Sequence, residues 1–237
     1  GYGALVSYAA LLKTAPPAEQ PALQRSTVAS ALRFAQTFPT DTRNGSVLTD
    51  AAEKLYALKE VDQAGATAQR VIELKPPAAD AQRRVAYTVL AYSAFDRHAY
   101  AVSEKAFAEA IKLTPEKDPA RADLVERQAA AIYKQAEVAR ASGKQQEAAQ
   151  TFARVGTVAS ANSAVAASAQ YDAAAALIAI KDWDGAIKTL EEFRRRFPNH
   201  ALQPEVTKKL AAAHLEKGQS ASAAAEFERI AAASKDP

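Results

Sequence analysis

The residues whose side chains could support catalysis or metal binding are few and scattered. The 237-residue chain has three histidines, His98, His200 and His214, and none stands at a ligand spacing from another. The chain contains no cysteine, which excludes a disulfide framework, a Cys-based zinc or iron–sulfur site and a cysteine nucleophile. We therefore expect no metal, no cofactor and no catalytic residue.

The charged residues also lack the arrangement of a reactive site. Paired-carboxylate catalysis needs two acids that face each other across a cleft, whereas Asp182 and Asp184 stand at a predicted helix start. The three arginines at 194–196 end a predicted helix, where positive charge complements the helix dipole. We interpret this run as a solvated helix end rather than an anion site, and Trp183 as a packing residue.

The composition points to helices. About a quarter of the residues are alanine, the best helix former, and only 8 are glycine. The 30 basic and 27 acidic side chains leave a net charge of +3, too small to indicate nucleic-acid binding by itself. The sequence has no methionine and opens on an apolar, helix-like stretch, so we expect it to be part of a longer or processed chain. No apolar run reaches the length of a membrane span.

Regularly spaced prolines indicate an internal repeat. Pro39, Pro76, Pro115, Pro198 and Pro237 each follow an amphipathic stretch, with spacings of 37, 39, 83 and 39 residues. The spacing of 83 equals two periods with one proline missing near residue 160. Because proline ends helices and the period is about 40 residues, the pattern predicts stacked helical hairpins.

Small and large residues alternate within each period in a way that suits helix packing. A small residue in each helix lets two helices approach closely, and a large residue one turn later fills the space against the next hairpin. The large residues are Phe107, Phe152, Leu190 and Phe227. Glycine at a mid-unit turn permits the left-handed conformation that ends a helix. The pattern predicts twelve helices, over residues 2–13, 20–37, 43–58, 61–74, 78–95, 98–113, 119–142, 144–156, 161–180, 183–196, 201–217 and 219–234.

This pattern resembles the tetratricopeptide repeat (TPR). The small residue of the family's first helix matches Ala52, Ala91, Ala136, Ala174 and Ala211. Its turn glycine matches Gly143 and Gly218, with Lys181 at that position in the fifth unit. Its second-helix alanine matches Ala64, Ala148, Ala186 and Ala223, its aromatic residue matches Phe107, Phe152 and Phe227, and its terminal proline matches Pro76, Pro115 and Pro198.

The resemblance implies an all-α fold, a right-handed superhelical solenoid of about six TPR-like antiparallel hairpins. It implies one domain over 1–237, with units near 1–40, 41–77, 78–117, 118–160, 161–199 and 200–237. These units are longer than the family's 34 residues. Stretched units with endings such as Phe197-Pro198 are similar to those of bacterial envelope TPR proteins, such as the periplasmic partner of the Tol–Pal system and the TPR lipoprotein of the outer-membrane assembly machine.

In this family, certain first-helix positions face a concave groove that binds a partner. The matched positions imply a partner-binding groove formed by Tyr56, Tyr92, Phe95, Tyr133, Arg140, Tyr171, Ile178 and Lys208. An alternative left open is that the tyrosines pack between helices with only their hydroxyls at the rim. The asparagines of the family's carboxylate clamp are absent from the matched positions, which disfavours a receptor for acidic chaperone tails.

The function implied is a non-enzymatic protein–protein interaction scaffold that binds a peptide, a helix or a partner subunit. Two alternatives stay open: a helical-repeat nucleic-acid-binding module, which would need recurring basic groove residues, and an α/α-barrel enzyme, which would need ring closure. No nucleic acid, small-molecule ligand or membrane span is expected. The resemblance places the protein in the bacterial periplasm or at the periplasmic face of the outer membrane, and otherwise in the cytoplasm.

Overall fold

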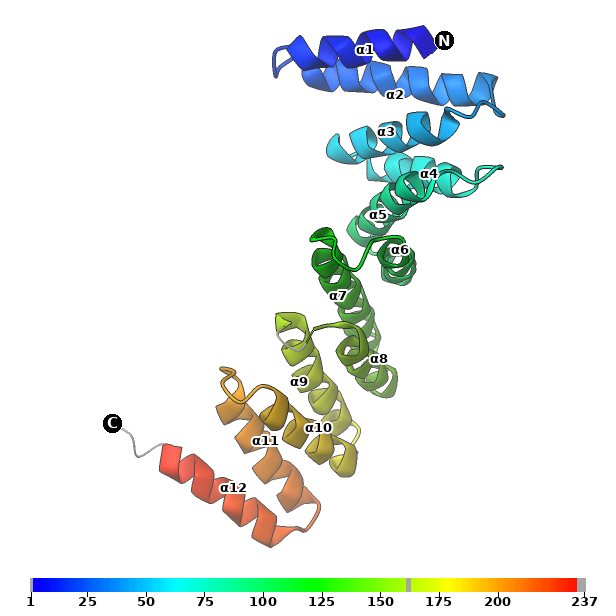
Figure 1. Cartoon of the computed structure of the whole chain (residues 1–237). Coiled ribbons are helices and arrows are strands. Elements are labelled where there is room, and N and C mark those ends of the chain that lie inside the picture. Colours follow the sequence, from blue (N-terminus) through cyan, green and yellow to red (C-terminus); the bar gives the residue numbers. More distant parts are fainter. Residues whose placement is uncertain (1, 161–162, 234–237) are drawn as a thin grey trace. The chain divides into compact units, whose positions relative to one another are not determined.

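The computed structural model describes residues 2–160 and 163–233, and these residues form twelve α-helices and no strand (Figure 1). The helices are α1 (Tyr2–Thr14), α2 (Gln20–Thr37), α3 (Asn44–Ala57), α4 (Val61–Ile72), α5 (Asp80–Asp96), α6 (Tyr100–Lys112), α7 (Ala120–Ala141), α8 (Gln145–Val158), α9 (Ala164–Ala179), α10 (Trp183–Arg196), α11 (Gln203–Glu216) and α12 (Ser220–Ala233). The predicted all-helical architecture is confirmed. The predicted helix start at 161, helix end at 234 and stop at Pro237 lie outside the described residues.

The helix ends follow local chemistry. Pro39 and Pro198 each lie two residues beyond the end of a helix, α2 and α10. Helix α5 begins at Asp80 rather than 78, because two prolines precede it and Ala79 is extended, with φ −58° and ψ 151°. Helix α9 begins after Ser163, whose hydroxyl accepts a hydrogen bond from the backbone N–H of Ala166 at 3.2 Å.

The chain divides into two compact units, Gly1–Leu124 and Val125–Pro237. In unit 1 each helix packs on the next along the chain from α1 to α6, and α3 also contacts α5 directly. In unit 2 the same sequential packing runs from α8 to α12. The hydrophobic clusters that hold these stacks combine residues from neighbouring hairpins, which is the contact pattern of a helical repeat.

The alanines predicted to allow close helix approach are buried. Ala52, Ala91, Ala136, Ala174 and Ala211 all have no exposed surface. The large residues Phe107, Phe152 and Leu190 are at most 1% exposed. The prediction for Phe227 is wrong, since its side chain is 49% exposed. It lies on α12, the last helix of the described chain, where no described hairpin follows to cover it.

Five helix-to-helix turns share one geometry. The residues Lys59, His98, Gly143, Lys181 and Gly218 all have φ between 59° and 78°. In each turn this residue's N–H bonds the carbonyl three residues back, and the next N–H bonds the carbonyl five residues back, at 2.8–3.0 Å. This double hydrogen bond is the Schellman motif, which ends a helix at a left-handed residue. The two predicted turn glycines and Lys181 are confirmed, and the structure adds Lys59 and His98.

Candidate functional site

The repeated turns fix the register of the first helix in each hairpin, which we call helix A. The side of helix A that carries the predicted groove residues is called the A face. Counted back from the left-handed turn residue, the predicted groove residues fall at three positions. Tyr56, Phe95, Arg140 and Ile178 lie three residues before the turn, Tyr92 lies six before, and Tyr133, Tyr171 and Lys208 lie ten before. These offsets of one, two and three helical turns share one side of helix A.

In unit 1 two of the tyrosines lie against each other. The ring centroids of Tyr56 on α3 and Tyr92 on α5 are 5.8 Å apart, and the Tyr92 ring also packs on Phe107 at 5.2 Å. The Tyr56 hydroxyl donates to Asp96 Oδ2 and the Tyr92 hydroxyl donates to Asp123 Oδ2, each at 3.1 Å. Each tyrosine is therefore held both by its ring and by a carboxylate on the following helix A.

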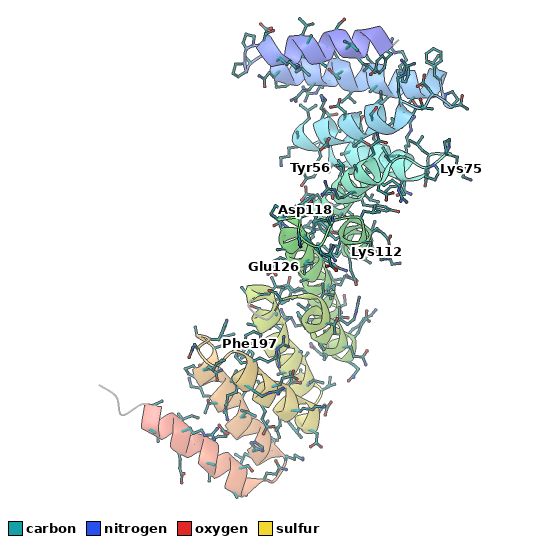
Figure 2. All side chains as sticks on the ribbon, in the orientation of Figure 1. Tyr56, Lys75, Lys112, Asp118, Glu126 and Phe197 are labelled. Carbon is teal, nitrogen blue, oxygen red and sulfur yellow. The ribbon has the colours of Figure 1, made fainter. Side chains whose placement is uncertain are left out.

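Figure 2 places Tyr56 and Lys75 at opposite edges of unit 1. Tyr56 lies near the turn that ends α3, and Lys75 lies in the loop between α4 and α5. Tyr56 thus lies at the edge that carries the α3–α4 turn, and Lys75 at the edge that carries the proline-containing α4–α5 loop.

Unit 2 contains a denser version of the same arrangement. The Tyr133 ring packs on Phe152 at 5.1 Å, and its hydroxyl donates to Asp172 Oδ2 at 2.5 Å. Arg140 Nη1 donates to the other oxygen of Asp172 at 2.9 Å. The Arg140 guanidinium lies 5.2 Å from the Phe152 ring centroid and 3.8 Å from Glu137 Oε1. Two side chains of helix A thus bind one carboxylate of the next helix A.

The pKa of Tyr133 reflects this environment. Burial of the ring raises the pKa of the phenol above its ordinary value of 10.0, and the hydrogen bond to Asp172 raises it further. Ionisation of Tyr133 would place a negative charge beside the carboxylates of Asp172 and Glu137. Repulsion from both carboxylates raises the pKa of Tyr133 further. Tyr133 therefore stays a neutral hydrogen-bond donor and is unsuited to act as a base.

The remaining predicted residues have more varied surroundings. Tyr171 is half-buried, with its ring 6.4 Å from Phe193 and Lys209 Nζ 5.3 Å from its centroid. Ile178 packs partly buried against the unit 2 core. Phe95 is half-buried and its ring contacts Tyr100 at 5.2 Å. Lys208 is exposed and pairs with Glu205 at 2.8 Å on its own helix.

The aspartates that bind the tyrosine hydroxyls were not predicted from the sequence. Asp96, Asp123 and Asp172 lie 40, 31 and 39 residues after their tyrosines. Two of these separations, 40 and 39, match the repeat period, so a Tyr followed by an Asp one unit later is the sequence signal that could have identified Asp96 and Asp172.

The arginine run has a different role from the one predicted. Arg194 makes two hydrogen bonds to the carboxylate of Glu226, at 3.0 and 2.6 Å, and the Glu226 side chain is only 9% exposed. This pair joins α10 to α12. The prediction of a solvated helix end is therefore wrong for Arg194. It fits Arg195, whose side chain is 79% exposed.

Other candidate chemistry has structural explanations. His98 is the left-handed residue of a turn, His200 packs on Phe193, and the buried His214 shares a 2.7 Å hydrogen bond with Gln219. Trp183 packs against the unit 2 core, as predicted. Within residues 2–160 and 163–233, no three His, Asp or Glu side chains gather in an arrangement that could hold a metal ion. No described helix is long and apolar enough to cross a membrane.

Unit 1 also has a pocket at its N-terminal end, and neither Tyr56 nor Tyr92 lines it. This pocket of about 230 Å³ lies between α1, α2 and α3, and Asp50 and Lys54 of α3 line it together with apolar residues of α1.

Comparison with known proteins agrees with the repeat. Residues 130–157 and 168–200 match the tetratricopeptide repeat family model. The first segment covers most of the α7–α8 hairpin, and the second covers most of the α9–α10 hairpin. Both lie in unit 2, and together they contain Tyr133, Arg140, Asp172 and Tyr171. No curated protein sequence matches the chain.

Solved structures resemble the chain at low identity. MamA protein is 15% identical over 79% of this chain and 90% of its own, with a TM-score of 0.44. YrrB, a TPR protein with an unusual peptide-binding site, is 14% identical over 83% and 90%, with a TM-score of 0.42. BtubC from P. vanneervenii is 20% identical over 92% of each chain, with a TM-score of 0.35. The family match identifies the α7–α8 and α9–α10 hairpins as tetratricopeptide repeats, in a chain whose described residues form helical hairpins throughout.

Proposed function

We propose that this chain is a non-enzymatic protein–protein interaction scaffold, and that the A face of its hairpins binds a peptide or a partner helix. The observation that carries the proposal is the set of tyrosine–aspartate pairs. Tyr56, Tyr92 and Tyr133 are each fixed by ring packing and by a carboxylate on the following helix A, yet each keeps part of its side chain at the surface.

Fixed, half-exposed tyrosines suit partner binding for an energetic reason. A tyrosine offers a large apolar area and a polar edge, and it loses little conformational entropy on binding because it has only two side-chain torsions. Here the hydrogen bond to aspartate has already ordered the ring, so the cost of immobilising it on binding is reduced further. Tyrosine and arginine, which also occurs here as Arg140, are the residue types that dominate binding energy at interfaces.

The proposal can be tested without knowledge of the natural partner. Peptides would be selected from a displayed random library against the complete chain, and their affinities measured by fluorescence anisotropy. Replacing Tyr133 and Tyr171 together by alanine should weaken the selected peptides by about a hundredfold, since two anchor residues each contribute about 1–2 kcal/mol. The single change Tyr133→Phe, which removes only the hydroxyl, should have a smaller effect.

The matched control is a double change on exposed residues of the second helices, Gln150→Ala and Glu191→Ala, which should leave affinity unchanged. Circular dichroism melting would show that each variant is folded. Retention of full affinity in the folded Tyr133/Tyr171 variant would remove the basis for an A-face site. A library of single-stranded RNA tested in parallel would reveal the alternative nucleic-acid function, if binding occurred and fell steeply with salt.

For the cellular setting, we propose that the scaffold serves in assembly or maintenance of the bacterial envelope, on its periplasmic side. The support is the unit length of 37 to 45 residues and the Phe-Pro unit endings, which are similar to those of envelope TPR proteins. An antibody raised against this chain would locate the protein in fractionated source cells. We expect the signal to follow a periplasmic marker, and recovery with a cytoplasmic marker would contradict the proposal.

A further inference from the structure

Two acidic side chains on the A face of unit 1 have no cationic partner. Glu53 on α3 and Asp96 at the end of α5 are both exposed, and α3 and α5 contact each other directly. Within the described residues, no lysine, arginine or histidine nitrogen forms an ion pair with either carboxylate. The neighbouring Asp50, by contrast, is paired with Lys54. Asp96 accepts the Tyr56 hydroxyl, the Tyr56 ring lies against Tyr92, and Glu53 precedes Tyr56 by one helical turn on α3.

Unit 2 shows what completes such a site. There Asp172 receives the Tyr133 hydroxyl on one oxygen and the Arg140 guanidinium on the other. In unit 1 Asp96 receives the Tyr56 hydroxyl on Oδ2, and no described donor contacts Oδ1. Unit 1 therefore also has a tyrosine–carboxylate pair, Tyr56 and Asp96, but no described arginine binds this carboxylate as Arg140 binds Asp172.

The surroundings in unit 1 also favour a positive group. Lys59 Nζ lies 5.6 Å from the centroid of the Tyr56 ring, so this ring already accepts a cation at one position. The pKa of Glu53 is raised by desolvation from neighbouring atoms and by the negative charge of Asp50, and the positive charge of Lys54 only partly offsets this. A cation bound beside Glu53 would favour its ionised form and offset the repulsion from Asp50.

We propose that the A face of unit 1 binds an arginine-containing peptide segment, with a guanidinium on Asp96 and further positive charge beside Glu53. This inference rests on the proposed peptide-binding function and names the chemistry of its partner. Arginine fits better than lysine because its planar guanidinium can donate two hydrogen bonds to one carboxylate and can stack on a tyrosine ring. The partner's arginine would take the role that Arg140 has in unit 2.

The test uses the complete chain and four synthetic peptides labelled with fluorescein. Each peptide has three copies of Gly-Ser-X, where X is arginine, lysine, citrulline or glutamate. Citrulline keeps the shape of arginine without its charge. We expect the arginine peptide to bind most tightly at low salt, the lysine peptide to bind more weakly, and the other two not to bind. The combined change Glu53→Gln and Asp96→Asn should weaken the arginine peptide at least about tenfold.

The matched control removes the same charge elsewhere in unit 1, by Glu73→Gln and Glu116→Gln at exposed positions off the A face, and should change affinity less than about twofold. Equal weakening by both double variants, or equal binding of the citrulline peptide, would overturn the inference. If library-selected peptides need Tyr133 and Tyr171 but ignore Glu53 and Asp96, the scaffold function stands and this inference fails. If no peptide binds at either place, the scaffold function itself fails.

Discussion

At the scale of single residues, the five left-handed turn positions share one backbone conformation but are occupied by three residue types. The same backbone conformation is occupied by glycine at 143 and 218, by lysine at 59 and 181, and by histidine at 98. A residue with a Cβ atom loses about 1–2 kcal/mol in this conformation. Three of the five turns therefore carry a strain that the surrounding hairpin overcomes.

This strain predicts opposite effects for two substitutions. Lys181→Gly should raise the free energy of unfolding by about 0.5 kcal/mol, because the relief of strain exceeds the extra entropy of an unfolded glycine. Gly143→Ala should lower it by about 1 kcal/mol. A Cβ atom at 143 would meet no other atom within 4 Å, so the loss measures backbone strain alone. Urea denaturation of both variants would check the signs, and a destabilised Lys181→Gly variant would contradict the strain argument.

A second prediction at this scale concerns the buried ion pair of Arg194 and Glu226. Glu226→Gln should lower the free energy of unfolding by about 2–3 kcal/mol, because it leaves the half-buried guanidinium without its charge partner. The comparison variant is Glu205→Gln, which breaks a pair whose side chains are 49% and 57% exposed. Its cost should stay below about 0.5 kcal/mol. Similar costs for the two variants would show that burial gives the Arg194 pair no special weight.

The same pair should make stability depend on pH. Burial raises the pKa of Glu226, but the hydrogen bonds and charge of Arg194 outweigh it, so the folded pKa lies below the ordinary 4.5. A group with a lowered pKa stabilises the fold fully above its unfolded pKa and loses this contribution as the pH falls through its folded value. The melting temperature of the wild type should therefore fall below about pH 4.5, and more steeply than that of Glu226→Gln. Parallel melting curves in both proteins would contradict this assignment.

At the scale of helices, local signals predict the elements well. Proline, turn glycine and periodic alanine lie within a few residues of the helix ends and contacts that they determine, so twelve helices follow from the sequence. The site is less predictable because its partners come from different helices. Tyr133 is evident on α7, but its aspartate lies on α9, and only the stacking of hairpins brings the two together. The Arg194 pair was missed for the same reason.

The role of alanine at helix contacts can be tested with neighbouring residues of α11. Ala211 has no exposed surface, whereas Ala212 is exposed. Ala211→Leu should lower the free energy of unfolding by about 1–3 kcal/mol, because the larger side chain forces α11 away from a packed neighbour. Ala212→Leu should change it by less than about 0.5 kcal/mol. Chemical denaturation measures both, and equal effects would mean that alanine serves only helix propensity here.

At the scale of the whole molecule, sequential packing implies that unit 2 carries its own stability. Its two hydrophobic clusters are formed by residues between 129 and 213. In a helical repeat, each hairpin depends mainly on its neighbours, and stability is close to a sum over hairpins and their interfaces. A fragment of residues 119–237, which keeps α7 complete, should therefore be helical and should unfold cooperatively.

A core substitution makes this prediction quantitative. Val155 has no exposed surface and lies in a cluster formed entirely within unit 2. Val155→Ala should cost about 2 kcal/mol through lost burial and a small cavity, and the cost should agree within about 0.5 kcal/mol in the fragment and in the complete chain. Urea denaturation followed by circular dichroism gives both values. A fragment that loses its helices without a transition, or a cost that differs by more than this margin, would show that the core of unit 2 depends on residues before 119.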